Sequence, residues 1–311
     1  MANFEQGEAA MSESPLITIG MPVYNCESTI AESIASILNQ TFEDWELIVL
    51  DDGSRDDTMA IARQFDDPRI RFVNGGRNRG LPACLNTIVA NCKTPLFARM
   101  DGDDIAYPRR FEKQLAALER NPEVDLLGGS ILIFDGTGDA RGFRRAAVTH
   151  AEICGRPWRI ANLVHVTWIG RATWFLKHPY NEWATHAQDR DLLIRSRRES
   201  RFAALPDTLA GVREARPLWS KLLPARKQML KTAIQEGARQ RDPGLLFGTA
   251  AAEILKCGLD FVATSTGLDH RLLRHRIPPV SPDRVEEWRN VLESTRARVL
   301  EEIGADLAIA S

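Results

Sequence analysis

The sequence has few cysteines and no cysteine pair with the spacing of a zinc site. Its five cysteines are an odd number in 311 residues, and no CxxC occurs. Neither a disulfide framework nor a zinc knuckle is therefore indicated, and a reducing, cytoplasmic compartment fits best. Residues 1–14 are polar and acidic without an apolar core, so they do not form a secretory signal. We expect them to be a disordered lead-in.

The chain also lacks a long uncharged apolar run and a large charge of one sign. Its most apolar long stretch, residues 244–268, is interrupted by Glu253, Lys256 and Asp260, so it is not a clear membrane span. The formal net charge of −2 gives no overall attraction to nucleic acid or membrane, and we expect no nucleic-acid partner. With 44% apolar and 26% charged residues, the composition is typical of a globular protein with a substantial core.

Short apolar runs alternate with helical patterns over the first 135 residues. We expect strands at 16–21, 46–50, 70–73, from 95 into Asp101, and at 124–134, and helices at 27–39, 56–65, 81–91 and 108–120. Alternation with short connections means parallel strands joined by crossover helices. The predicted fold class is α/β, a doubly wound, mostly parallel sheet flanked by helices.

Four polar clusters follow the first four of these strands. They are Pro22–Asn25, Asp51–Ser54, Asn74–Gly80 and Asp101–Asp104. Because the carboxyl ends of parallel strands share one edge of a sheet, all four clusters should lie on one rim, where such sheets bind ligands. The glycines do not form GxGxxG at the first turn and no GxxxxGK[ST] occurs, so a dinucleotide fold or P-loop is not supported.

The cluster at Asp101–Asp104 is the richest in carboxylates. Asp101, Asp103 and Asp104 lie within four residues after an apolar strand, where their oxygens can bind a hard divalent cation such as Mn²⁺ or Mg²⁺. A solvated acidic turn, or an N-cap for the helix after Pro108, is the alternative.

Four motifs in order carry a resemblance to a known family. PLITIGMPVYN, SILNQTFEDWELIVLDDGSRDDT, NRGLPACLN and ARMDGDDIAYPRR make residues 15–135 resemble the nucleotide-sugar-binding half of family 2 glycosyltransferases, which have the GT-A fold. The resemblance implies that Pro22 and Tyr24 line the nucleotide and that Asp52 contacts its base, while Asp51 binds there or holds the turn. It also implies Asp103 as the main metal ligand with Asp101 beside it.

At two positions of this half, more than one role for the side chain remains open. Arg79 matches a region of polar contacts to the nucleotide-sugar, although a surface arginine fits equally well. Asp104 either supports the metal ligands or caps the next helix.

The second half, residues 136–215, is the expected acceptor-binding half of the same domain. Residues 136–149 look like an exposed loop or hairpin, and 164–171 like a strand. The family often has a histidine at the position of His165, which suits a phosphate or acceptor contact or a core residue. Gln188-Asp189 resembles the family's Glu-Asp motif, which makes Asp189 the general base. Gln188 departs from that motif, and Asp191 is interpreted as a surface or helix-start charge.

Tryptophans gather in the same half. Four of the seven lie between residues 158 and 183. Indole rings suit sugar pockets as well as small cores, so both interpretations stay open. The four are Trp158, Trp168, Trp174 and Trp183.

The implied activity is an inverting, metal-assisted transfer of a sugar from a nucleotide-sugar, with UDP as the default, to a hydroxyl of a glycan or lipid-linked acceptor. Two alternatives remain. A nucleotidyltransferase also places carboxylates on an α/β rim, but it usually carries a glycine-rich loop after its first strand, which PVYN is not. A non-catalytic sugar-nucleotide or glycan-binding module would explain Gln188 as a mark of lost catalysis.

Residues 216–311 are predicted to form a helical C-terminal appendage, with helices at 244–268 and 282–303. Between Arg213 and Arg241 lie eight basic and two acidic residues, interleaved with apolar ones. This pattern fits a basic amphipathic helix at the inner membrane surface, and equally a solvated helical face packed on the rest of the protein. Dimerisation and presentation of a lipid-linked acceptor are two uses for the appendage.

Overall fold

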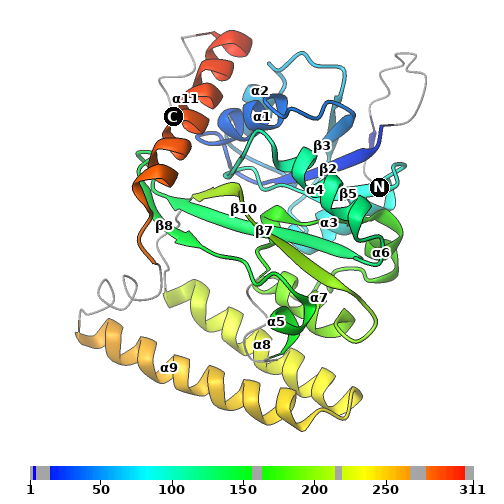
Figure 1. Ribbon diagram of the computed structural model, residues 1–311, viewed down its shortest axis with the longest axis vertical. Helices are drawn as coiled ribbons and strands as arrows, with labels where there is room; N and C mark the ends of the chain where they lie inside the picture. The colour runs from blue at the N-terminus through cyan, green and yellow to red at the C-terminus, as the bar shows by residue number, and fades with distance from the viewer. Residues whose placement is uncertain (1–2, 5–14, 156–162, 214–218, 267–277, 305–311) are drawn as a thin grey trace.

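A computed structural model describes residues 3–4, 15–155, 163–213, 219–266 and 278–304 (Figure 1). Its strands are β1 (Asn3–Phe4), β2 (Ile17–Val23), β3 (Trp45–Asp51), β4 (Ile70–Asn74), β5 (Leu96–Arg99), β6 (Ile105–Ala106), β7 (Leu126–Phe134), β8 (Ala140–Arg144), β9 (Ile169–Arg171) and β10 (Phe202–Arg213). Its helices are α1 (Ile30–Leu38), α2 (Thr58–Ala62), α3 (Leu81–Ala90), α4 (Arg110–Arg120), α5 (His150–Cys154), α6 (Ala172–Lys177), α7 (Gln188–Ser196), α8 (Trp219–Arg239), α9 (Thr249–Thr266) and α11 (Pro282–Ile303), with short turns η2 (His165–Thr167) and η3 (Gly244–Gly248).

All the strands belong to one sheet. Its order is β1-β4-β3-β2-β5-β9-β7-β10-β6, and β8 pairs with β7 off this path. β4, β3, β2 and β5 are mutually parallel, as are β7 and β10. The three-residue β9 runs antiparallel to both β5 and β7 and joins the two parallel blocks. The predicted fold class, a mostly parallel α/β sheet, is confirmed.

Apolar residues fill both faces of this sheet. Every residue of β2 is buried, as expected for a parallel strand covered on both sides. On one face, Ile30, Ile34 and Ile37 of α1 join a buried cluster with β2 and α4. On the other face, α3, α6 and α7 pack over β3 and β5. Each fully buried aliphatic side chain contributes about 1.5–3 kcal/mol of transfer free energy to this core.

The tryptophans divide between core and surface. Trp168 and Trp174 are buried in the second cluster, so they fill the core rather than a sugar pocket. Trp183 has 39% of its surface exposed, and Trp158 lies outside the described residues.

The C-terminal helices occupy two different places. α8 and α9 lie side by side at the lower end of Figure 1, next to α7, whereas α11 returns to the other end beside α1. Trp288 of α11 donates its indole N–H to the carbonyl of Gly138 at 2.8 Å and lies against Phe134, with ring centroids 4.6 Å apart. The two predicted helices at 244–268 and 282–303 are confirmed as η3 with α9 and as α11.

One local prediction is confirmed, two are right only in part, and one of the alternatives for Asp104 is excluded. Residues 136–149 contain β8, which forms a hairpin with β7. The predicted strand at 164–171 is wrong in its first part, because Thr167 bonds back to the carbonyl of Val164 and forms a 3₁₀ turn before β9. Asp191 lies in the first turn of α7, which confirms the helix-start interpretation, but it is not a surface charge: it is 1% exposed and bonds Asn181, Arg195 and Thr232. Asp104 does not cap α4, which begins after Arg109 without a side-chain cap.

Three further observations bear on the opening predictions. The five cysteines are free. Within the expected lead-in, Asn3–Phe4 pair with β4, and the rest of that segment lies outside the described residues. In the part of the chain that the structure describes, no helix is both long and apolar enough to cross a bilayer.

Candidate active site

The four polar clusters meet at one edge of the sheet, as predicted. They follow β2, β3, β4 and β5, which are parallel neighbours, and the loops are bonded to one another. The backbone N–H of Asn25 donates to Ser54 Oγ at 3.0 Å, and Thr29 Oγ1 donates to the carbonyl of Gly102 at 2.8 Å. The rim is therefore a connected surface formed by the loops after these strands.

Asp51 and Asp52 hold the loops of this rim in shape. Asp51 Oδ1 accepts the N–H of Ser54 at 2.8 Å, across a turn in which Gly53 has φ +81°, the left-handed region that glycine adopts without strain. Asp52 accepts the backbone N–H groups of Arg79 at 2.7 Å and Gly80 at 2.8 Å. Asp52 thus fixes the loop after β4 against the end of β3, and any contact of this carboxylate with a base would share its oxygens with that loop.

The other predicted nucleotide residues lie at the same rim. Pro22 is buried within β2, and Tyr24 directly after it is 42% exposed. An exposed aromatic ring at this edge offers a flat face to a planar ligand. The guanidinium of Arg79 is exposed and donates to Thr87 Oγ1 at 3.0 Å.

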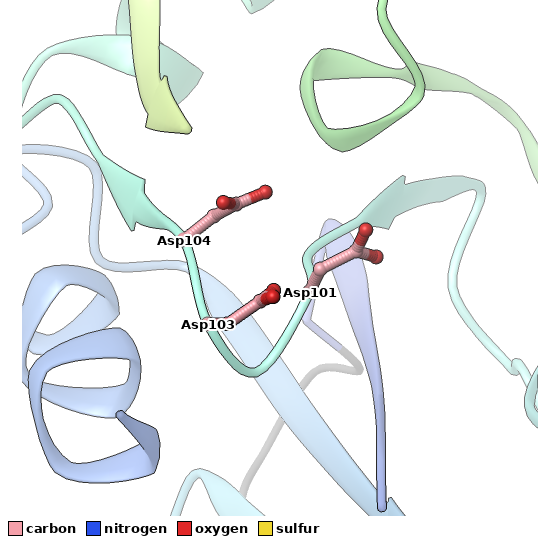
Figure 2. Close-up of side chains that lie close together, drawn as sticks. All are labelled: Asp101, Asp103 and Asp104. Carbon is pink, nitrogen blue, oxygen red and sulfur yellow. The ribbon is translucent and has the colours of Figure 1, made fainter. Parts of the chain in front are cut away.

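The acidic loop between β5 and β6 brings three carboxylates together. One oxygen each of Asp101, Asp103 and Asp104 lies within 4.8 Å of the others, and Figure 2 shows the three side chains close together along the loop. Asp104 is buried and accepts the N–H of Arg213 at 2.9 Å, so it also holds the end of β10. An all-oxygen donor set of this size fits a hard divalent cation.

The charge balance within this loop is uneven. Asp101 pairs with the fully buried Arg99 at 3.1 Å, and although burial opposes it, Arg99 and His165 hold the pKa of Asp101 below its usual range. Partial desolvation in the crowded loop and the charge of Asp101 raise the pKa of Asp103. Burial and the charges of Asp103 and Asp101 raise the pKa of Asp104 well above its usual range. At Asp103 the positive charges of His165 and Arg213 do not offset desolvation and the repulsion from Asp101, and a divalent ion would reduce that repulsion.

His165 connects the acidic loop to Asp189. Its Nε2 lies 3.0 Å from Asp101 Oδ2 and its Nδ1 lies 3.3 Å from Asp189 Oδ2. Burial and Arg99 oppose protonation of His165, but Asp101 and Asp189 prevail and raise its pKa to about 9. Burial would raise the pKa of Asp189, yet its bond to His165 lowers it to about 2. At neutral pH the three groups therefore form an imidazolium between two carboxylates.

Sequence reasoning missed Arg99 and the bridging position of His165. An arginine inside the apolar strand ahead of Asp101 was a signal for the first, because a buried cation requires a nearby anion. No local pattern indicated the second, since His165 meets Asp101 and Asp189 only through the fold. Gln188, where the sequence departs from the family motif, is buried at the first position of α7.

Comparison with known proteins places this fold and rim in a family. Residues 18–178 match the family model of glycosyl transferase family 2. Because this match covers more than half of the chain, the protein belongs to that family.

EpsE of Bacillus subtilis, described as a putative glycosyltransferase, is 42% identical over 137 residues, which are 43% of this chain and 49% of EpsE. WfgD of Escherichia coli, a UDP-Glc:alpha-D-GlcNAc-diphosphoundecaprenol beta-1,3-glucosyltransferase, is 37% identical over 106 residues, 34% of this chain and 42% of WfgD. The alignments thus span about half or less of these relatives.

Solved structures support the GT-A fold. TarS 1–349 from S. aureus in complex with UDP-GlcNAc superposes with a TM-score of 0.57 at 19% identity, covering 92% of this chain and 82% of that one. The mannosyltransferase PcManGT from Pyrobaculum calidifontis, in complex with GDP-Man and Mn²⁺, gives 0.53 at 17% identity, covering 94% and 88%. At these identities the likeness establishes the fold alone.

Proposed function

We propose that the protein is an inverting glycosyltransferase that moves a sugar from a UDP-sugar to a hydroxyl group by single displacement. One observation carries this proposal: the acidic loop and Asp189, far apart in the sequence, meet at one rim and are joined through His165. We assign donor binding to residues 15–135 and acceptor binding to residues 136–215, because the four rim loops and Asp189 divide between these segments.

Asp189 is the proposed general base. With its pKa lowered to about 2, it is ionised at neutral pH, as a proton acceptor must be. It takes the proton of the acceptor hydroxyl while that oxygen attacks the anomeric carbon. The new C–O bond forms as the bond to the phosphate oxygen breaks, and the nucleoside diphosphate leaves from the opposite face, so configuration inverts. Because the bond to His165 stabilises the carboxylate, Asp189 is a stronger base when that bond loosens.

Asp103 and Asp101 are the proposed ligands of a divalent cation, Mn²⁺ or Mg²⁺. When bound, the ion would supply positive charge to the pyrophosphate of the leaving group. Asp103 is the better placed of the two, since Asp101 is already engaged by Arg99 and His165. Asp104 bonds the backbone of Arg213 and supports the loop.

The donor and acceptor classes are inferred from relatives. The complexes of TarS with UDP-GlcNAc and of PcManGT with GDP-Man and Mn²⁺ favour a metal-bound sugar nucleotide. The diphosphoundecaprenol acceptor in the name of WfgD favours a lipid-linked acceptor over a free glycan. We place the reaction in the cytoplasm, in line with five unpaired cysteines.

The test is turnover of a panel of UDP-, GDP- and dTDP-sugars with Mn²⁺. We expect one donor to be consumed, and Asp189→Asn to lower kcat about 10²–10⁴-fold while the calorimetric affinity for that sugar nucleotide changes little. Asp139→Asn is the matched control, because this aspartate is exposed at the β7–β8 turn, with 71% of its side chain accessible.

Two results would count against the proposal. Full turnover by Asp189→Asn would remove this residue from the role of base. Tight binding of a sugar nucleotide without turnover, with every acceptor class tried, would favour the non-catalytic binding module.

A further inference from the structure

The outward side of η3 and α9, which follow α8 in the α8–α9 hairpin, is apolar. Phe247, Ile254 and Leu255 are 69%, 67% and 65% exposed, the three largest exposures among the big hydrophobic side chains that the structure describes. Residues 247, 251, 254, 255 and 258 follow helical spacing, and all five are exposed and uncharged. We call Phe247, Ile254 and Leu255 the outer apolar face.

The inward side of the same helix carries charge instead. Glu253 has 4% of its side chain exposed and pairs with Arg226 at 2.9 Å, Lys256 at 2.6 Å and Arg190 at 3.6 Å. A helix that packs on a protein normally buries its apolar residues and exposes its charges. The reversed arrangement in α9 indicates that an apolar partner covers its outer side.

The charges of the α8–α9 hairpin indicate the kind of partner. Over residues 223–258, every exposed charged residue is a cation, and the acidic ones are satisfied internally: Glu236 by Arg239, Asp242 by Arg197 and Glu253 as above. A second copy of the hairpin would bring like charges together, whereas an anionic lipid surface would attract them. The exposed cations are Lys227, Lys231, Arg239 and Arg241. Of these, Arg239 pairs with Glu236 and Lys231 lies over the ring of Trp183.

We propose that the outer apolar face inserts into the headgroup region of an anionic bilayer, with the cations of the hairpin on the lipid phosphates. The large apolar side chains enter the boundary between headgroups and acyl chains, as in amphipathic helices that lie in the plane of a membrane. This assigns the contact to η3 and α9, whereas the basic pattern in the sequence pointed to the segment of α8.

The hairpin is connected directly to the segment that carries Asp189. Gln228 Oε1 accepts the N–H of His186 at 3.1 Å, and Thr232 Oγ1 donates to Asp191 Oδ1 at 2.7 Å. α8 therefore packs on the start of α7, and α9 reaches the same helix through the pair of Glu253 with Arg190. If the proposed function holds, docking would bring a lipid-linked acceptor to the side of the molecule where its hydroxyl is deprotonated.

The experiment is flotation of the full chain with vesicles of phosphatidylcholine alone or with 30% phosphatidylglycerol, a composition of about physiological anionic content. We expect binding to the anionic vesicles only. Replacing the outer apolar face by F247S/I254Q/L255Q should weaken partitioning about tenfold or more, and K227Q, which removes an exposed lysine of α8, should reduce it by about fivefold. L176Q and L300Q are matched controls, because these leucines are 54% and 48% exposed on α6 and α11, and they should bind like the wild type.

Several outcomes would overturn the inference. The first is a wild-type protein that does not bind anionic vesicles. The second is a loss of vesicle binding in L176Q or L300Q as large as that in the triple variant. The third is a wild-type dimer in light scattering that the triple variant dissociates, while neither protein binds vesicles. Consumption of the sugar nucleotide with a water-soluble acceptor analogue, in the absence of vesicles, separates this inference from the proposed function. A triple variant that fails to float but keeps that turnover supports the inference, whereas an inactive wild type that still floats contradicts only the proposed function.

Discussion

Two sites in this molecule group charged side chains around carboxylates, and the pKa values of those carboxylates shift in opposite directions. Glu253 on α9 lies among Arg226, Lys256 and Arg190. Burial would raise its pKa, but the bond to Lys256 and the nearby cations lower it. In the loop after β5, Arg99 and His165 contact Asp101 directly, whereas desolvation and neighbouring carboxylates raise the pKa values of Asp103 and Asp104. A carboxylate matched by the protein's own cations supports the fold, whereas an excess of carboxylates favours a bound cation.

The largest effect should come from Asp103→Asn in the presence of Mn²⁺. Removing the exposed oxygen ligand leaves Asp101, already paired, and Asp104, already bonded to Arg213. We expect the Mn²⁺-dependent gain in UDP affinity to fall by about a hundredfold, the upper end of what loss of a supporting residue costs a metal site. Isothermal titration calorimetry with and without EDTA measures this gain.

A matched variant isolates the ligand role. Asp56→Asn alters a carboxylate at the same rim that bonds Thr58 and Glu27 rather than the acidic loop, and it should keep the Mn²⁺ effect. Equal UDP affinities of wild type and Asp103→Asn with Mn²⁺ would mean that the excess charge of the loop is not used for metal.

The next largest effect should be on the free energy of unfolding, at the site around Glu253. Glu253→Gln removes the anion from three partly buried cations, and we expect it to lower the free energy of unfolding by about 1.5–3 kcal/mol, the range for hydrogen bonds to charged groups. Denaturant titration measures it. Glu301→Gln on the exposed side of α11, whose partner Arg298 lies 3.7 Å away, is the control and should change stability little.

Acidification should reproduce part of the loss of stability that Glu253→Gln causes. The pKa of Glu253 lies below its ordinary value of 4.5 in the folded state, so its contribution is complete above pH 4.5 and is lost as pH falls through the folded-state value. The stability gap between wild type and Glu253→Gln should therefore narrow below pH 4.5. A gap that stays constant from pH 7 to pH 3.5 would show that the effect of the substitution is steric.

Some features of the fold and of the site can be predicted from the sequence, and others cannot. The parallel block was predictable because strands buried on both faces are continuous apolar runs, as in Ile17–Val23, with polar turns at their carboxyl ends. The acidic loop and Asp189 were identified by motifs. The bridge through His165, the burial of Asp191 and the reversed polarity of α9 could not be predicted, because each depends on which distant residue lies opposite. In α9 the helical pattern was correct, but sequence alone does not say which side faces the protein.

The smallest expected effect is the change in stability caused by Asp103→Asn without metal. Its sign should be opposite to that of Glu253→Gln, so it distinguishes the two sites. The folded-state pKa of Asp103 is raised above 3.8, so its ionised form destabilises the folded state at neutral pH and this penalty disappears below pH 3.8. Replacing it with asparagine in EDTA should therefore leave stability unchanged or raise it by about 0–1 kcal/mol at pH 7, opposite in direction to Glu253→Gln. Thermal melts in EDTA at pH 7 and pH 5 measure the change. A metal-free loss comparable to that of Glu253→Gln would show that Asp103 is balanced within the protein, and the argument for a cation at this loop would fail.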